Sequence, residues 1–185
     1  MEESELNDVR NKEIGFIFQN YQLISTYNIL QNIIMPLVVR GMSSGEAEEK
    51  CMDTIRLLGL DHRLRHKPSE LSGGQKQLVA MASACAMRPA AYVLDEPTAA
   101  LDVDAMLRLR DAVARLKRSG AAVLIAEHRL WWLRGVADRV VLMQGGRIVS
   151  DMEAGEFGGL SDEDRRRLGV RAWDVVDVAL PGRVR

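Results

Sequence analysis

A serine followed by two glycines opens a helix expected at residues 71–87, and this combination could bind a phosphate group. A helix N-terminus offers unpaired backbone N–H groups and a partial positive charge, and glycines let an anion approach the backbone closely. An ordinary capped helix after a loop would carry the same residues, and the pattern Ser-Gly-Gly alone favours that alternative. The segment consists of Leu71, Ser72, Gly73, Gly74 and Gln75.

Two adjacent carboxylates follow an apolar segment at residues 91–94. Because Pro97 stops a strand, Asp95 and Glu96 are expected at the carboxyl end of a buried strand, where open α/β sheets bind ligands. Paired acids suit a magnesium nucleotide: Asp95 could hold Mg²⁺, and Glu96 could orient and deprotonate an attacking water. A turn that simply ends the strand is the alternative.

A histidine and a glutamine end two further apolar segments. His128 follows the segment 121–126, which would bring it to the same sheet edge as Asp95, where an imidazole could contact a terminal phosphate. Gln19 ends the segment 13–19, and its amide could reach a metal ion or a water. Either residue taken singly is more often structural, so the argument depends on their combination with the other motifs.

The elements that must position these groups alternate between helix and buried strand. The apolar segments at residues 13–19, 91–94 and 121–126 are predicted strands, whereas residues 43–58, 71–87 and 103–117 have helical spacing. Ser43 and Glu46 form a capping-box pattern at the start of the first of these helices. This alternation predicts a parallel α/β sheet. A hairpin is predicted at residues 140–150, and a helical appendage from residue 151 onward.

The order and spacing of these motifs resemble the nucleotide-binding domain of ABC transporters, over about residues 14–149. The resemblance implies an α/β P-loop NTPase fold of the ABC ATPase type, with a parallel sheet and an inserted α-helical subdomain. Four regions are then expected: a residual core strand and Q-loop (1–19), a helical subdomain with the signature motif (20–88), a RecA-like core (89–150) and a C-terminal appendage (151–185).

The resemblance also implies a role for each candidate residue. Gln19 is then the Q-loop glutamine, which holds Mg²⁺ together with Asp95 of the Walker B strand. Glu96 is the catalytic glutamate, Asp102 the D-loop aspartate and His128 the switch histidine. In the family, the signature motif contacts the ATP that the other subunit of a head-to-tail dimer holds. Residues 71–75 would therefore bind ATP in trans.

The phosphate-binding loop of the family, G-x-x-x-x-G-K-[ST], does not occur in this sequence. None of the lysines follows a glycine; they are Lys12, Lys50, Lys67, Lys76 and Lys117. In the family this loop precedes the Q-loop, so the fold is expected to lack the N-terminal β-subdomain and the Walker A strand. The sequence predicts weak ATP binding and background hydrolysis by the chain alone, with exposed apolar surface and an open sheet edge.

Two parts of the chain resemble different subfamilies. Residues 11–71 are similar to the ATPases of macrolide and lipoprotein exporters, whereas residues 82–169 are more similar to those of the energy-coupling factor importers for cobalt and vitamins. The chain could be a mosaic, or the helical insert could vary independently of the catalytic core. Neither interpretation identifies the transported substrate.

Composition and charge restrict the classes of partner. The 185 residues carry 25 basic and 26 acidic side chains, so no strong net field favours nucleic acid or an anionic membrane. The apolar run at residues 29–39 is far shorter than the roughly 20 residues that a membrane span needs. Two cysteines outside any CxxC pair, and an acidic start unlike a signal peptide, favour a reducing cytosol.

The leading interpretation is therefore an ATP-hydrolysing subunit, cytoplasmic and peripheral on the inner face of the cell membrane, that energises transport by nucleotide-driven dimer closure. Its cofactors would be ATP and Mg²⁺. Its partners would be a second ABC ATPase subunit and an integral membrane subunit, whose coupling helix would enter a groove beside the Q-loop; no nucleic acid is expected. The alternative is a degenerate module that only supplies the signature motif to a partner ATPase.

Overall fold

The computed structural model describes residues 13–18 and 22–170 of the chain. The chain divides into two compact units, Met1–Glu127 and His128–Arg185, each with its own internal packing. Gln19, the expected Q-loop glutamine, lies outside the described residues. The other candidate residues all fall within them.

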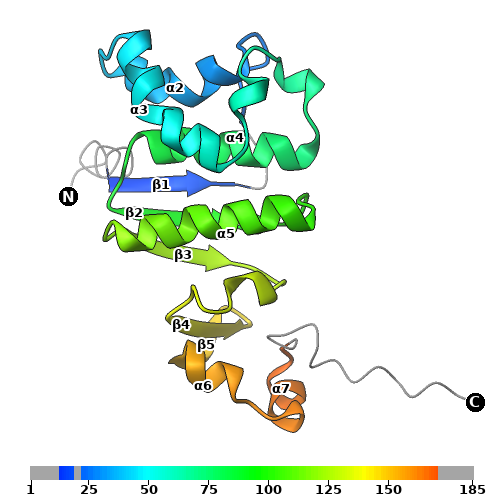
Figure 1. The fold of residues 1–185 in the computed structure, drawn as a ribbon. Coiled ribbons are helices and arrows are strands. Elements are labelled where there is room, and N and C mark those ends of the chain that lie inside the picture. Colours follow the sequence, from blue (N-terminus) through cyan, green and yellow to red (C-terminus); the bar gives the residue numbers. More distant parts are fainter. Residues whose placement is uncertain (1–12, 19–21, 171–185) are drawn as a thin grey trace, which may run out of the picture. The chain divides into compact units, whose positions relative to one another are not determined.

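The first unit contains a three-stranded parallel sheet with the order β1-β2-β3 (Figure 1). The strands are β1 (Ile14–Ile17), β2 (Ala91–Asp95) and β3 (Ala122–Ala126). A helical segment links β1 to β2, and α5 (Val103–Arg118) links β2 to β3. The last helix before β2, α4 (Gly73–Ala86), packs on β1, α5 packs on β3, and the two helices contact each other, so they cover one face of the sheet. The α/β class with a parallel sheet is confirmed.

The helical segment comprises α2 (Ile29–Val39), α3 (Ser44–Leu57), two short 3-10 turns (Asp61–Arg63 and Pro68–Glu70) and α4. A complete capping box precedes each of the three α-helices, as predicted for Ser43 and Glu46. The helices enclose an apolar core, so the run at residues 29–39 is a core helix. Its fully buried side chains include Ile29, Ile33, Ala47, Ile55, Leu58 and Val79.

The sheet face opposite α4 and α5 is open in the part of the chain that the structure describes. Side chains alternate along the strands, so Tyr92 and Leu94 are buried beneath the helices. Phe16 and Leu124 share the other face through the strand register and are 40% and 65% exposed. Parallel sheets are normally covered on both faces. The exposed apolar surface and the open edge at β3 agree with the expectation from the sequence.

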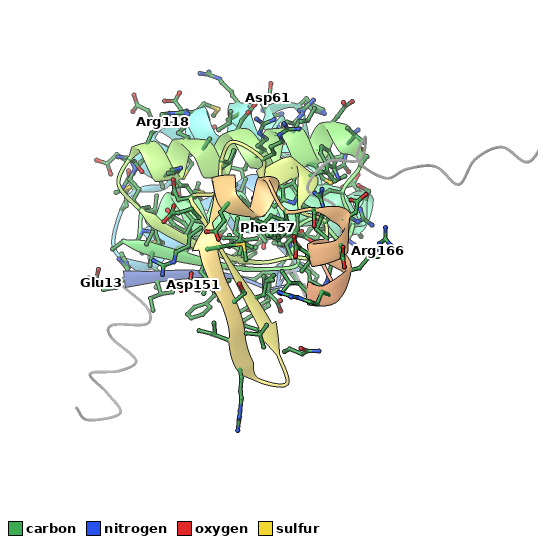
Figure 2. The ribbon with its side chains drawn as sticks, turned by 90° about the horizontal axis from the view of Figure 1, so that it is seen from below. Glu13, Asp61, Arg118, Asp151, Phe157 and Arg166 are labelled. Atoms are coloured by element: carbon green, nitrogen blue, oxygen red, sulfur yellow. The ribbon has the colours of Figure 1, made fainter. Side chains whose placement is uncertain are left out.

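The second unit contains an antiparallel hairpin of β4 (Arg139–Gln144) and β5 (Arg147–Glu153), followed by α6 (Ala154–Gly158) and α7 (Asp162–Leu168). Gly145 and Gly146 make the two-residue turn with φ values of 55° and 74°, which favour glycine. Figure 2 shows Asp151 on β5, where it pairs with Arg139 across the hairpin. The hairpin is longer than predicted, because the backbone pairing of the two strands continues to Arg139 and Glu153 and takes β5 into the expected appendage.

One buried asparagine organises the segment at residues 22–28. Asn32 of α2 is 6% exposed, and its Oδ1 accepts a hydrogen bond from the Ile24 N–H at 2.7 Å. Its Nδ2 donates to the carbonyls of Ile24 at 3.1 Å and Asn28 at 2.9 Å. A single amide thus provides an acceptor for the Ile24 N–H and a further donor for two carbonyls that also accept from backbone N–H groups.

We expect Asn32→Leu, which keeps the number of side-chain heavy atoms but removes the amide, to lower the free energy of unfolding by about 1–3 kcal/mol, because the Ile24 N–H loses its acceptor. Urea denaturation measures the loss, and proteolysis within residues 22–28 should accelerate. As a control, Gln31→Ala changes an exposed capping residue and should cost no more than about 1 kcal/mol. Equal urea midpoints for Asn32→Leu and the wild type would contradict this role.

Candidate functional site

The two adjacent carboxylates lie at the carboxyl edge of the parallel sheet, as predicted. Asp95 is the last residue of β2 and pairs in register with Ala126, the last residue of β3. The next N–H, that of Glu96, donates to the Ala126 carbonyl at 2.9 Å. Glu96 has a φ of 43°, in the left-handed region that non-glycine residues rarely adopt. Strain of this kind persists where the surroundings hold it, often at functional sites, and here it turns the chain out of the strand.

A buried threonine holds the turn after these carboxylates. Thr98 is fully buried, and its Oγ1 donates to Oε2 of Glu127 at 2.5 Å. Glu127 directly precedes His128 in the sequence. The hydrogen bond therefore ties the turn of the Asp-Glu pair to the residue before the candidate switch histidine. This pair could not be found from the sequence, since the two residues lie 29 positions apart and only the pairing of β2 with β3 brings them together.

Ser72 of the signature segment can both cap its helix and bind a ligand. Its Oγ accepts from the Gln75 N–H at 3.2 Å, while Oε1 of Gln75 accepts from the Ser72 N–H at 3.0 Å. A hydroxyl that accepts a hydrogen bond still has its own proton to donate. The exposed Ser72 hydroxyl is therefore compatible with both interpretations of the sequence pattern, a capped helix and a phosphate-binding one.

Gly74 is required by packing within the chain itself. A Cβ at this position would lie 2.7 Å from the carbonyl oxygen of Ala100 and 3.2 Å from Cδ2 of Leu101. The signature helix thus touches the loop that connects the Asp-Glu pair to α5. Asp102 ends that loop as the N-cap of α5, with Oδ1 accepting from the Ala105 N–H at 2.8 Å. The fold brings residues 71–75 and the loop that ends at Asp102 together, which their separation in the sequence did not reveal.

His128 is the first residue of the second unit, and its side chain is exposed. Among residues 13–18 and 22–170, no group of three or more His, Cys, Asp or Glu side chains is placed to hold a metal ion by itself. Magnesium that enters with a nucleotide commonly takes only one or two carboxylates, with phosphate oxygens and waters completing its shell. The exposed Asp95 carboxylate fits that requirement.

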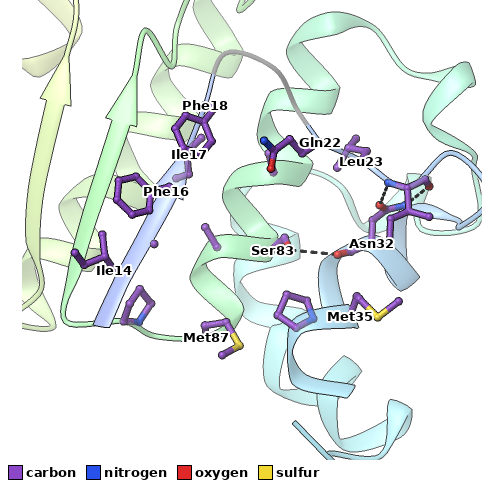
Figure 3. Close-up of a pocket in the computed structure, with 16 residues that line it drawn as sticks. Ile14, Phe16, Ile17, Phe18, Gln22, Leu23, Asn32, Met35, Ser83 and Met87 are labelled. Carbon is purple, nitrogen blue, oxygen red and sulfur yellow. Dashed lines mark hydrogen bonds between the residues drawn. The ribbon is translucent and has the colours of Figure 1, made fainter. Parts of the chain in front are cut away.

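A pocket of about 290 Å³ lies between β1, α2 and α4 (Figure 3). Phe18 and Gln22, on either side of residues 19–21, both line it. The rings of Phe16 and Phe18 stack with their centroids 5.6 Å apart, and both side chains are more than a third exposed. The Ser83 hydroxyl donates to the Asn32 carbonyl at 3.2 Å and joins α4 to α2. The result is an open, mostly apolar pocket.

The fold and the placement of these groups define an α/β nucleotide-binding protein. The sequence profile of the family described as "ABC transporter" matches residues 2–99. The lipoprotein-releasing system ATP-binding protein LolD of Bacteroides thetaiotaomicron is 41% identical over 152 residues, which are 82% of this chain and 69% of LolD. The glutamine transport ATP-binding protein GlnQ of Geobacillus stearothermophilus is 35% identical over 165 residues, 89% of this chain and 68% of GlnQ. The chain therefore belongs to the ABC transporter family.

Solved structures support the same assignment. The ATP-binding cassette MJ0796, in a dimeric post-hydrolysis state bound to ADP and Pi, superposes with a TM-score of 0.75 at 28% sequence identity. The match covers 83% of this chain and 68% of that one. Within the described residues, no helix is long and apolar enough to cross a membrane. The chain thus has the fold of an ATP-binding cassette and is an ATPase subunit of an ATP-driven transporter.

We expect Gly74→Ala to lower the free energy of unfolding by about 1–3 kcal/mol, because the new methyl group meets the Ala100 carbonyl and forces α4 away from the loop. Gly45→Ala is the matched control, since Gly45 is helical and a Cβ there meets nothing within 4 Å. That change should instead stabilise by about 0.4–1 kcal/mol. If the two variants have equal urea midpoints, the close contact at Gly74 does not exist in solution.

The bond between Thr98 and Glu127 generates a second expectation. Thr98→Val removes the hydroxyl without changing the volume, so the free energy of unfolding should fall by about 1–3 kcal/mol as a hydrogen bond to a carboxylate is lost. Thr98→Ser keeps the hydroxyl and should recover most of that hydrogen-bond energy, losing only the methyl contact. Thermal and urea unfolding measure both variants, and a serine variant no more stable than the valine variant would refute the bond.

Proposed function

We propose that this chain acts in a head-to-tail dimer of ABC ATPase subunits, in which closure around ATP energises a membrane transporter. The observation that carries the proposal is the direct packing of Gly74 against the Ala100 carbonyl, which joins the signature helix to the loop of the Asp-Glu pair. A movement of either motif would therefore be passed to the other. In this arrangement residues 71–75 contact the phosphates of an ATP held by the partner subunit, with the Ser72 hydroxyl as a donor.

The roles proposed for the remaining residues follow from their positions. Asp95, together with Gln19, would hold Mg²⁺, which neutralises charge on the phosphates when it is bound. Glu96 would orient and deprotonate the attacking water, and its strained backbone supports this role because it directs the chain away from the strand. His128 would contact the terminal phosphate, and Asp102 would act as the D-loop aspartate at the dimer interface.

We also propose that the chain alone binds ATP weakly, because none of its lysines lies in a G-x-x-x-x-G-K-[ST] loop. The open sheet face with Phe16 and Leu124 supports dependence on a further protein surface, either in a partner or in a longer form of this chain. The second candidate function, a module that only lends its signature to a partner ATPase, is favoured by the same observation.

The pocket between β1, α2 and α4 is the proposed contact for an integral membrane subunit. Its apolar lining and the exposed, stacked rings of Phe16 and Phe18 suit the apolar face of a short coupling helix. Such a contact would hold the chain at the cytoplasmic face of the cell membrane. The relation to LolD supports an exporter-type insert in residues 11–71, and the importer-like character of residues 82–169 makes a mosaic origin part of the proposal.

The experiment is nucleotide hydrolysis by the assembled transporter, in which this chain carries Glu96→Gln or Ser72→Arg. If this chain completes its own site, Glu96→Gln should trap ATP there and lower turnover by at least tenfold. Ser72→Arg should lower turnover at the partner's site, because the longer side chain blocks the approach to phosphate. The isolated 185-residue chain should show no saturable turnover.

Glu49→Gln, on the exposed side of α3, makes the same chemical change away from the site and should leave turnover unchanged. If Ser72→Arg is inactive while Glu96→Gln behaves as the wild type, the signature-only function is correct. Wild-type turnover in both site variants would eliminate both candidate functions.

A further inference from the structure

A second pocket, of about 550 Å³, lies at the amino edge of the same sheet, opposite the edge that carries Asp95. Ala90 and Ala121, which directly precede β2 and β3, line it together with residues of α3 and α5. Both α4, which starts at the signature, and α5, which starts at Asp102, run from the candidate ATP-contacting edge toward this pocket. None of the roles proposed above uses it.

The rim of this pocket is positively charged. Lys50, Arg88 and Arg115 line it, against one acidic residue, Asp53. An Arg115 guanidinium nitrogen lies 3.6 Å from Oδ2 of Asp53, whereas Lys50 and Arg88 make no ion pair with any described residue. Cations near the C-terminal ends of α4 and α5 also compensate the helix dipoles. That effect does not account for Lys50, which lies in the middle of α3.

Apolar side chains and two buried side chains with polar atoms also line the pocket. Leu57, Pro89 and Leu116 supply apolar surface, while Tyr92 is 1% and Cys85 8% exposed. Burial raises the pKa of the Cys85 thiol to about 12 and also raises the pKa of Tyr92, so both groups stay protonated near neutral pH.

The Tyr92 hydroxyl accordingly acts as a hydrogen-bond donor. Within residues 13–18 and 22–170, no group accepts from it. A donor that opens into a pocket with a cationic rim, and has no acceptor among these residues, is available to bind an anionic acceptor from outside the chain.

We propose that this pocket binds a small organic anion, whose apolar body lies against Tyr92 and Leu116 and whose carboxylate or phosphate group is held by Lys50 and Arg88. The volume lies within the range of about 300–1,000 Å³ typical of small-molecule sites, and the lining combines apolar side chains with charged and polar groups. Arginine and lysine side chains both hold carboxylates and phosphates through charge-assisted hydrogen bonds. The inference does not depend on the ATPase roles, because none of the residues that line this pocket has one of those roles.

The probe is 2-naphthoate, compared with its neutral analogue 2-naphthamide, and binding to the full chain is measured by isothermal titration calorimetry. The wild type should bind the carboxylate and not the amide. The Lys50→Gln/Arg88→Gln double variant should weaken binding at least tenfold, and Tyr92→Phe should weaken it several-fold. Asp53→Asn should strengthen binding several-fold, because it releases Arg115 from its ion pair.

The matched control is Arg56→Gln/Arg118→Gln, which removes the same charge from α3 and α5 outside the pocket and should bind naphthoate as the wild type does. Lys50 and Arg88 are exposed, so their replacement should preserve the fold, which urea unfolding verifies. Equal binding of naphthamide, unchanged affinity in the Lys50/Arg88 variant, or no naphthoate binding at millimolar concentration would each overturn the proposal. Phosphate and carboxylate ligands are then distinguished by repeating the titration with 2-naphthyl phosphate.

Discussion

The contact between Gly74 and the carbonyl oxygen of Ala100 is the constraint on which the arrangement of the motifs depends. A backbone approach this close is possible only without a Cβ, and it joins the start of α4 to the loop that leaves β2. The start of α4 therefore packs directly against the loop that contains the Asp-Glu pair and ends at Asp102.

Around this contact, the first unit is built asymmetrically. The helices α4 and α5 cover one face of a three-stranded sheet, and the capped helices α2 and α3 enclose a separate apolar core next to it. The opposite sheet face carries Phe16 and Leu124 exposed to solvent. Since a parallel sheet with one bare apolar face is poorly stabilised in water, this part of the protein is suited to association with more polypeptide. The uncovered face and the absence of a phosphate-binding loop in the sequence lead to the same proposal, namely that ATP binding requires a further component.

Much of the fold could be predicted from the sequence because its signals are local. Ser43 and Ser72 begin their helices through side chains only three residues away, and the apolar runs at β2 and β3 identify buried strands. The placement of Asp95 at the carboxyl edge also follows from local order, since parallel strands align their carboxyl ends. The predicted end of β5 was wrong. The pairing of Arg139 with Asp151 depends on the register of the hairpin and not on local composition.

By itself, the sequence determined the helices, the strands and the identity of the groups that could do chemistry, because residue type, spacing and order express these properties directly. Only the tertiary structure decided that Thr98 bonds to Glu127, that Gly74 meets Ala100, and that three cationic side chains line one pocket with Tyr92. Each of these contacts joins residues on different elements, and the distance between such residues depends on how the elements pack. Strand pairing and helix packing are long-range interactions, so no local pattern in the chain contains them.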